Sequence, residues 1–229
     1  MYLSRIPINP FKAKTQQAFS NLNIFHGAIE KAVNQTEARK LWRLDFLDNN
    51  WYLLLVTDTK PDLNHLQDEF GFTDQPGSSK KYDSYLESIQ KGNKYYFRVV
   101  LNPTVTQSPA EQFNSKGKLK KGKVTAVTDE NQLINWFIEK GERFGFAVSQ
   151  YSAFHQERIP TFQIEETKHV RIEKGKQKKT FSFFSADISG ILTVEDEEKF
   201  KECLKTGIGR EKAYGQGLLT AIPVAPFPC

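Results

Sequence analysis

Cysteine is scarce in this chain, and long apolar runs are missing. The two cysteines, Cys203 and Cys229, argue against a disulfide framework and are typical of a reducing compartment. No apolar stretch approaches the roughly 20 residues that cross a bilayer, and the N-terminus has no secretory signal. We therefore expect a cytoplasmic protein that does not enter a membrane.

Metal-binding motifs are also missing. The four histidines are His26, His65, His155 and His169. None begins a His-x-Thr pair, which disfavours a two-histidine phosphoesterase, and neither HExxH nor CxxC occurs. The carboxylates at 195–198 lie in the first turn of a predicted helix, where negative charge suits the helix dipole. Any reaction is therefore expected to use no metal and no cofactor.

Positive charge is present only in modest excess, but it is concentrated in two patches. The formal net charge is +5, and residues 116–123 and 168–179 each carry +5, so that the remainder sums to −5. One such patch would be explained by solubility alone. Two patches, together with Arg210 and Lys212 in a basic glycine loop, indicate a polyanion such as RNA or DNA as ligand.

Residues 1–107 are predicted to form one α+β unit. Apolar residues recur at helical spacing over Lys12–Val33, and Tyr2–Ile8 alternates as a strand does. Two strands, a helix and a closing strand are then expected at Leu41–Leu47, Trp51–Thr57, Leu63–Phe70 and Tyr95–Leu101. This βαββαβ order is that of a ferredoxin-like domain, the layout of RNA-recognition modules.

Residues 108–122 have no periodicity and are predicted to be a basic linker, after which residues 123–229 repeat the same order. The first elements of this second unit are expected at Lys123–Val127, from Asp129 to Phe144 and at Phe146–Tyr151. A long basic hairpin of Phe162–Ile172 and Thr180–Val194 follows, then a helix that Thr193 with Asp196 opens and Gly207 ends, and a last strand at Gly217–Ile222. The predicted fold class is α+β with two tandem ferredoxin-like domains.

The segment Gly207–Pro223 is set apart by glycines at Gly207, Gly209, Gly215 and Gly217. Glycine adopts positive φ readily and lets another backbone or a phosphate approach closely, so a shaped loop is expected. A helical pattern precedes this loop and a strand follows it, which is the reverse of a dinucleotide-binding GxGxxG. Alone, the spacing predicts a helix C-cap and a turn into the final strand.

One reaction suits a histidine, many cations and no metal motif: transesterification of RNA by the 2′-OH. It needs a group that removes the 2′ proton, a group that protonates the leaving 5′ oxygen, and positive charge beside the phosphate. A histidine can perform either proton transfer at cellular pH. Spacing alone would make His26 a half-buried histidine on an amphipathic helix.

Six blocks follow one another in an order that resembles the CasE family, the CRISPR RNA-processing endoribonucleases of type I-E systems: MYLS, NIFHGAIEKAV, YYFRVVLNP, KGKVTAVTDENQLINWF, GILTVED and GIGREKAYGQGLLTAIP. The resemblance implies two ferredoxin-like domains and metal-independent cleavage of the repeat stem-loop of precursor CRISPR RNA. It further implies a cyclic or 3′ phosphate and a 5′ hydroxyl as product ends, and retention of the product for the other subunits of the Cascade complex. A monomer is expected when the protein is free.

The resemblance also implies site residues. The family's catalytic histidine falls on His26, and its RNA-binding cations fall on the basic hairpin and the glycine loop. The hairpin candidates are Lys168, Arg171 and Lys174, to which Lys178 and Lys179 add charge. The candidates in the glycine loop are Arg210 and Lys212. The family often has a tyrosine three residues before the histidine, where this chain has Asn23, which cannot exchange a proton at neutral pH. A lysine or a water could replace that tyrosine.

Two other functions stay open. The first is an RNA-binding subunit that holds a stem-loop but cuts slowly or not at all. The second is a small-molecule enzyme on a ferredoxin-like fold, against which the two lysine-rich patches argue. Whether residues 116–123 contact RNA or a protein partner is left open as well.

Overall fold

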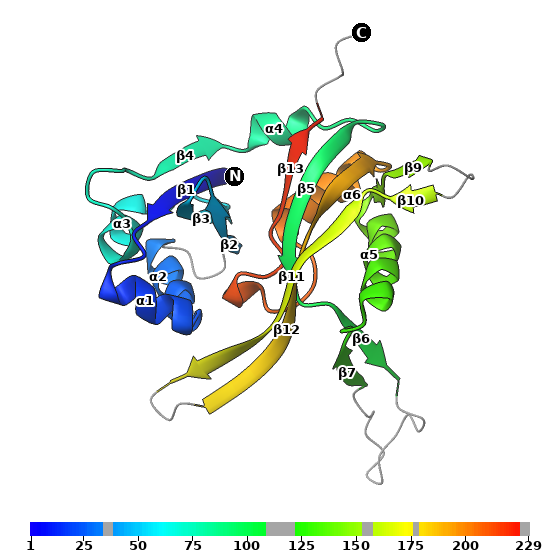
Figure 1. Cartoon of the computed structure of the whole chain (residues 1–229). Coiled ribbons are helices and arrows are strands. Elements are labelled where there is room, and N and C mark those ends of the chain that lie inside the picture. The colour runs from blue at the N-terminus through cyan, green and yellow to red at the C-terminus, as the bar shows by residue number, and fades with distance from the viewer. Residues whose placement is uncertain (34–38, 109–121, 153–157, 176–178, 225–229) are drawn as a thin grey trace, which may run out of the picture.

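The computed structural model describes residues 1–33, 39–108, 122–152, 158–175 and 179–224. They form two α+β units side by side, each with a sheet and helices packed on one face (Figure 1). Each unit has a core of buried apolar side chains, and the core of the second unit extends to Leu41 and Val56 of the first. The predicted fold class of two ferredoxin-like units is confirmed.

The first unit runs through the βαββαβ order with a pair of helices in place of its first helix. Its elements are β1 (Tyr2–Ile8), α1 (Ala13–Ser20), α2 (Asn23–Ala32), β2 (Lys40–Leu47), β3 (Asn50–Thr57), α3 (Leu63–Phe70) and β4 (Ser78–Lys81). The strands form a sheet of order β2-β3-β1-β4, in which β2 and β4 are the edges. The tight turn between β2 and β3 has positive φ at Asp48 and Asn49.

The helix predicted over Lys12–Val33 is broken into two at Asn21. The Oδ1 of Asn21 accepts the backbone N–H of Asn23, and its Nδ2 donates to the carbonyl of Glu173 at 3.1 Å. Asparagine side chains compete with the helical hydrogen bonds of the backbone in this way. The break therefore ties the start of α2 to a strand of the second unit.

The first sheet is closed by β4, not by the strand at Tyr95–Leu101. That strand, β5 (Lys94–Leu101), pairs with two strands of the second unit, and the prediction that it closes the first unit is wrong. Edge strand β4 is short and polar, as edge strands often are, so its sequence lacks the apolar alternation that marks β5. The chain changes sheets between Lys81 and Lys94, after a short helix α4 (Asp83–Glu87), and not within 108–122.

The second unit begins with β5 and has the same βαββαβ order with additional short strands. Its further elements are β6 (Thr104–Gln107), β7 (Lys123–Ala126), α5 (Glu130–Phe144), β8 (Phe146–Val148), β9 (Gln150–Ser152), β10 (Arg158–Pro160), β11 (Phe162–Lys174), β12 (Lys179–Val194), α6 (Glu197–Thr206), the 3₁₀ turn η1 (Lys212–Tyr214) and β13 (Leu219–Pro223). Its main sheet has the order β11-β12-β5-β13, and β8 pairs with the far end of β12.

Three predictions about this unit have different outcomes. The strand expected at Lys123–Val127 exists as β7, but it pairs with β6 in a separate two-stranded ribbon and does not open the main sheet. The helix start at Asp129 is confirmed, since its side chain accepts the backbone N–H of Gln132. The start predicted at Thr193 is wrong, because β12 continues to Val194 and α6 is capped by Asp196, which accepts the backbone N–H of Lys199.

A buried arginine joins the two units. The guanidinium of Arg43 on β2 holds the carboxylate of Asp45 through two hydrogen bonds of 2.6 and 2.8 Å. It also donates to the backbone carbonyls of Arg98 and Leu218 and to the Thr220 hydroxyl, all in the second unit. Arg43 and Asp45 are each only 3% exposed, so this hydrogen-bonded pair is sealed between the sheets.

No described helix is both long and apolar enough to cross a membrane.

Candidate active site

The glycine-rich loop, residues 207–217, carries η1 from the end of α6 to the first unit. All four of its glycines have positive φ, between 70° and 85°. A Cβ at Gly215 would come within 3.0 Å of the Trp42 ring, and the Trp42 indole donates to the carbonyl of Ala213 at 3.2 Å. The loop is thus seated directly against β2 of the first unit, a contact that a side chain at position 215 would hinder.

The seated loop brings Tyr214 to His26. His26 lies on α2 with 31% of its side chain exposed, and its ring meets the edge of the Tyr214 ring at a centroid distance of 5.9 Å. Tyr214 is itself buried in a small apolar cluster with Ile172 and Phe183 from the basic hairpin, the pair of strands β11 and β12. A histidine of the first unit therefore faces a surface built by the second.

Lys174, at the end of β11, brings a cation to the same place. Its ammonium lies 5.1 Å from the centre of the Tyr214 ring and 5.2 Å from the centre of the Phe181 ring. Cation–π contacts of this kind restrict a long side chain that would otherwise be free in solvent. The exposed Lys174 is thereby held beside His26.

The charges around His26 favour its neutral form. Burial lowers the pKa of His26 from its ordinary value of 6.5, and the ammonium groups of Lys174 and Lys40 lower it further, while Glu30 opposes them. A neutral imidazole can accept a proton, so His26 is available as a base at neutral pH.

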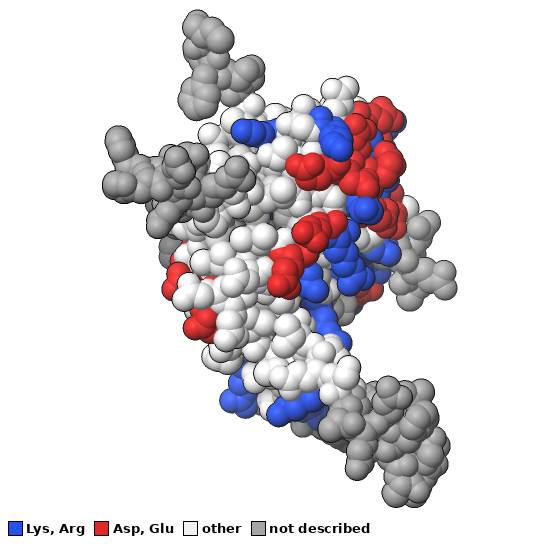
Figure 2. All heavy atoms as spheres, turned by 90° about the vertical axis from the view of Figure 1, so that its right-hand side faces the viewer, with Lys and Arg blue, Asp and Glu red and all other residues white. Residues whose placement is uncertain are grey.

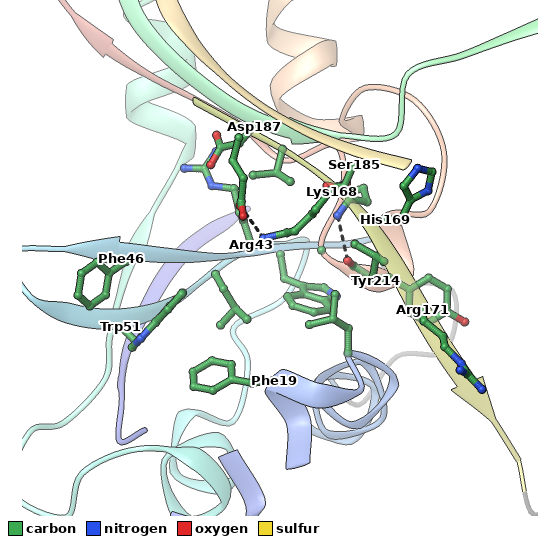
Figure 3. Close-up of a pocket in the computed structure, with 18 of the residues that line it drawn as sticks. Phe19, Arg43, Phe46, Trp51, Lys168, His169, Arg171, Ser185, Asp187 and Tyr214 are labelled. Carbon is green, nitrogen blue, oxygen red and sulfur yellow. Dashed lines mark hydrogen bonds and ion pairs between the residues drawn. The ribbon is translucent and has the colours of Figure 1, made fainter. Parts of the chain in front are cut away.

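A pocket of about 680 Å³ opens between the units, next to the turn that precedes α2. One wall is apolar and comes from the first unit, with Phe19, Phe46 and Trp51, as Figure 3 shows. Most of the charged side chains that line it are paired, as Arg43 with Asp45, Arg98 with Asp187 and Lys168 with Glu166. His169 and Arg171 line it as well, and Arg171 is 71% exposed, with Glu173 at 4.0 Å. Arg171 is therefore the least engaged cation among the charged residues of this lining.

A family model described as "CRISPR associated protein" matches residues 1–223. The chain belongs to this family. Among curated proteins it is 24% identical to "CRISPR-associated endoribonuclease Cse3" of Thermus thermophilus, over 97% of this chain and all of that protein.

Solved structures resemble this CRISPR-associated protein over almost its whole length. A CRISPR endoribonuclease Cse3 bound to a 19-nucleotide RNA has a TM-score of 0.75 at 23% identity, covering 97% of this chain and 100% of the other. A chain of a CRISPR RNA-guided surveillance complex in a pre-nicking state has a TM-score of 0.61 at 16% identity, covering 98% and 100%. These likenesses support the fold of the CRISPR-associated chain.

The cations predicted on the basic hairpin differ in how free they are. Arg171 is 71% exposed, with Glu173 no closer than 4.0 Å, and Lys179 is also exposed. Lys168 is engaged by Glu166 at 2.6 Å. Lys178 lies outside the described residues, as does most of the patch at 116–123.

The two cations predicted in the glycine-rich loop have different surroundings in the structure. Arg210 is exposed and forms an isolated β-bridge with Asn102. Lys212 is half-buried, and its ammonium donates to the carbonyl of Thr206 at the end of α6, at 2.7 Å. Burial also lowers the pKa of Lys212. Its geometry is that of a cap on α6.

The face of the molecule that is seen in Figure 2 is poorly suited to a polyanion at its upper end. Figure 2, which views the molecule from the right-hand side of Figure 1, shows acidic side chains crowded among lysines and arginines at its upper end. Helices α5 and α6 carry exposed acids, among them Glu139, Glu142, Glu198 and Glu202. Within the described part of the chain, no group of three or more His, Cys, Asp and Glu residues is arranged to hold a metal ion.

Three neighbours of His26 in the structure, Glu30, Lys40 and Tyr214, are not among the site residues predicted from the sequence. Glu30 could have been found, because it lies four residues after His26 on the same helix face. Lys40 and Tyr214 are brought there by tertiary contacts from another strand and another unit, and no local spacing indicates them.

We expect Gly207→Ala to destabilise the protein more than Gly175→Ala. Both glycines have positive φ, 70° and 67°, but Gly207 combines it with a ψ of 166°, a backbone conformation that essentially only glycine adopts. A Cβ at Gly207 also comes within 2.7 Å of the carbonyl oxygen of Gly217, whereas one at Gly175 meets no described atom within 4 Å. Urea denaturation should show a further loss of about 1 to 3 kcal/mol for Gly207→Ala. Equal losses would contradict a loop held by close backbone approach.

Proposed function

We propose that this protein is a metal-independent endoribonuclease that binds and cleaves the repeat stem-loop of precursor CRISPR RNA. The observation that carries the proposal is the position of His26, a half-buried histidine of the first unit that faces Tyr214 and Lys174 of the second. Membership of the CRISPR-associated family supports it, as does the likeness to a relative named as an endoribonuclease and to one bound to RNA.

In the proposed reaction, neutral His26 accepts the proton of a ribose 2′-OH. The 2′ oxygen attacks the adjacent phosphorus, and the bond from phosphorus to the 5′ oxygen breaks. The upstream product ends in a 2′,3′-cyclic phosphate, or a 3′ phosphate after hydrolysis, and the downstream product begins with a 5′-OH. The leaving oxygen must take a proton, and Lys174 and Tyr214 are the proton-bearing side chains that the second unit brings beside His26.

Lys174 has a second task in this scheme. Negative charge increases on the phosphate oxygens as the 2′ oxygen attacks, and an ammonium fixed beside them stabilises that charge. The two aromatic rings under Lys174 fix it without neutralising it, unlike a carboxylate partner. Asn23, at the start of α2, cannot donate a proton at neutral pH, so protonation of the leaving 5′ oxygen is assigned to a group of the second unit.

The basic hairpin is proposed to hold the RNA stem. A paired stem presents mainly its backbone, which suits exposed cations on a long two-stranded arm. Arg171, Lys174 and Lys179 are exposed on this arm, and Lys174 lies close enough to His26 to lower its pKa. Retention of the cleaved RNA for the other subunits of a Cascade complex fits the structural likeness to a chain of a CRISPR RNA-guided surveillance complex.

His26→Ala should abolish cleavage and leave binding intact. Loss of a proton-transfer group lowers such rates by roughly 10²- to 10⁴-fold. The measurement is cleavage of repeat stem-loop RNA in excess EDTA, with affinity measured in parallel on an RNA with a 2′-deoxy residue at the cut site. His65→Ala on α3 is the control and should cleave normally. Absence of cleavage by the wild-type protein would contradict the enzyme and favour an RNA-binding subunit.

Removing exposed hairpin cations should flatten the salt dependence of RNA binding. Each phosphate contact contributes a slope of roughly 0.7 to 0.9 in a plot of log affinity against log salt concentration. Arg171→Ala and Lys179→Ala should each reduce the slope by about that amount. Lys199→Ala, on the acid-rich face at α6 and 59% exposed, should leave it unchanged. An equal effect of all three variants would contradict a specific role for the hairpin.

A further inference from the structure

Glu30 and Lys40 form an ion pair directly behind His26. Glu30 follows His26 by one helical turn on α2, and its Oε1 lies 3.7 Å from the His26 Nδ1. Its other oxygen, Oε2, lies 2.6 Å from the ammonium of Lys40 at the start of β2. The carboxylate therefore bridges the imidazole and a lysine from a different element.

The bridge is better fixed than an ordinary surface pair. Only 6% of the Lys40 side chain is exposed, and lysine is rarely buried to this extent without a partner. Glu30 supplies that partner, with 39% of its own side chain exposed. The difference from a surface pair lies in the lysine: in the pair of Lys199 and Asp196 on α6 the carboxylate is similarly exposed, at 40%, but the lysine is 59% exposed.

The remaining neighbours of His26 leave one nitrogen open. Charged and titratable groups face the ring from α2 (Glu30), β2 (Lys40), β11 (Lys174) and η1 (Tyr214). Only the carboxylate of Glu30 can attract a proton on Nδ1, because the other three groups are cations or a neutral phenol. The opposite nitrogen, Nε2, has no hydrogen-bond partner among the described residues.

Building on the proposed nuclease function, we infer that Glu30, held by Lys40, is a positioning residue for His26. Its carboxylate keeps the protonated Nδ1 of the imidazole turned inward and leaves Nε2 to accept the 2′-OH proton of the RNA. The proton passes from the ribose oxygen to Nε2, and the positive charge formed on the ring is balanced by Glu30. An inward carboxylate that orients a catalytic histidine is a general arrangement in proton-transfer enzymes.

The inference makes predictions of opposite sign for the two partners. Glu30→Gln removes a negative charge near the imidazolium, so the pKa of His26 should fall by roughly 0.5 to 1. Lys40→Met removes a positive charge, so the pKa of His26 should rise. In the wild-type protein the cleavage rate should increase with pH to a midpoint below 6.5 and then level off, and the midpoint should move with the pKa in each variant.

The decisive experiment is an NMR titration of the His26 ring in the full chain without RNA. The ¹⁵N shifts should report the tautomer with hydrogen on Nδ1 in the wild-type protein and a mixture of tautomers in Glu30→Gln. Glu69→Gln is the matched control, because Glu69 pairs with Lys14 at 3.3 Å in the same unit. This control should leave the His26 shifts unchanged, and circular dichroism should confirm that all variants are folded.

Activity measurements then test the link to cleavage. In Glu30→Gln the single-turnover rate at saturating RNA should fall on the order of tenfold, with unchanged RNA affinity, because the ring is no longer oriented. Unchanged tautomer and pKa of His26 in Glu30→Gln would overturn the inference whatever the cleavage rate. The expected shifts without any wild-type cleavage would support the coupling of Glu30 to His26 and contradict the proposed nuclease function.

Discussion

The molecule depends on one buried guanidinium. Arg43 belongs to the sheet of the first unit, but three of its five hydrogen bonds go to the second unit. A buried charge is tolerated only when it is paired and fully hydrogen-bonded, so a displacement of the units that kept Arg43 buried would cost several kcal/mol through its three lost hydrogen bonds to the second unit. The angle between the two sheets is therefore set by a directional polar contact and not by apolar packing alone.

The contact that Arg43 makes between the units allows the candidate active site to form, since neither unit contains all of its residues. The first unit supplies His26, Glu30 and Lys40, and the second supplies Tyr214 and Lys174. Further contacts hold the same register near the site: Asn21 bonds to the backbone at Glu173, and the glycine-rich loop lies against Trp42. A histidine on a helix face, which alone would be a packing residue, thereby acquires fixed cations and a proton-bearing neighbour.

Local pattern predicted most elements, and non-local contacts explain what it missed. Helix α3, the capping aspartate Asp129 and the long basic hairpin follow from spacing that each segment carries itself. The alternation of β5 marks a strand but does not say which sheet receives it. The break at Asn21 depends on a partner 152 residues away, and β4 has no apolar alternation to detect. His26 came from family resemblance, whereas the neighbours that tune it required the fold.

Loosening the contact between the units, with His26, Glu30, Lys174 and Tyr214 unchanged, tests whether both units are needed to form the site. The double replacement of Arg43→Met and Asp45→Asn removes both charges, so no unpaired carboxylate stays buried between the sheets. With a folded variant, single-turnover cleavage of the repeat stem-loop should fall on the order of 100-fold, because small misplacements of a catalytic group cost that much. Arg5→Met, an exposed arginine over Tyr52 on the same sheet, should have no effect. A folded double variant that cleaves at the wild-type rate would contradict a site assembled from both units.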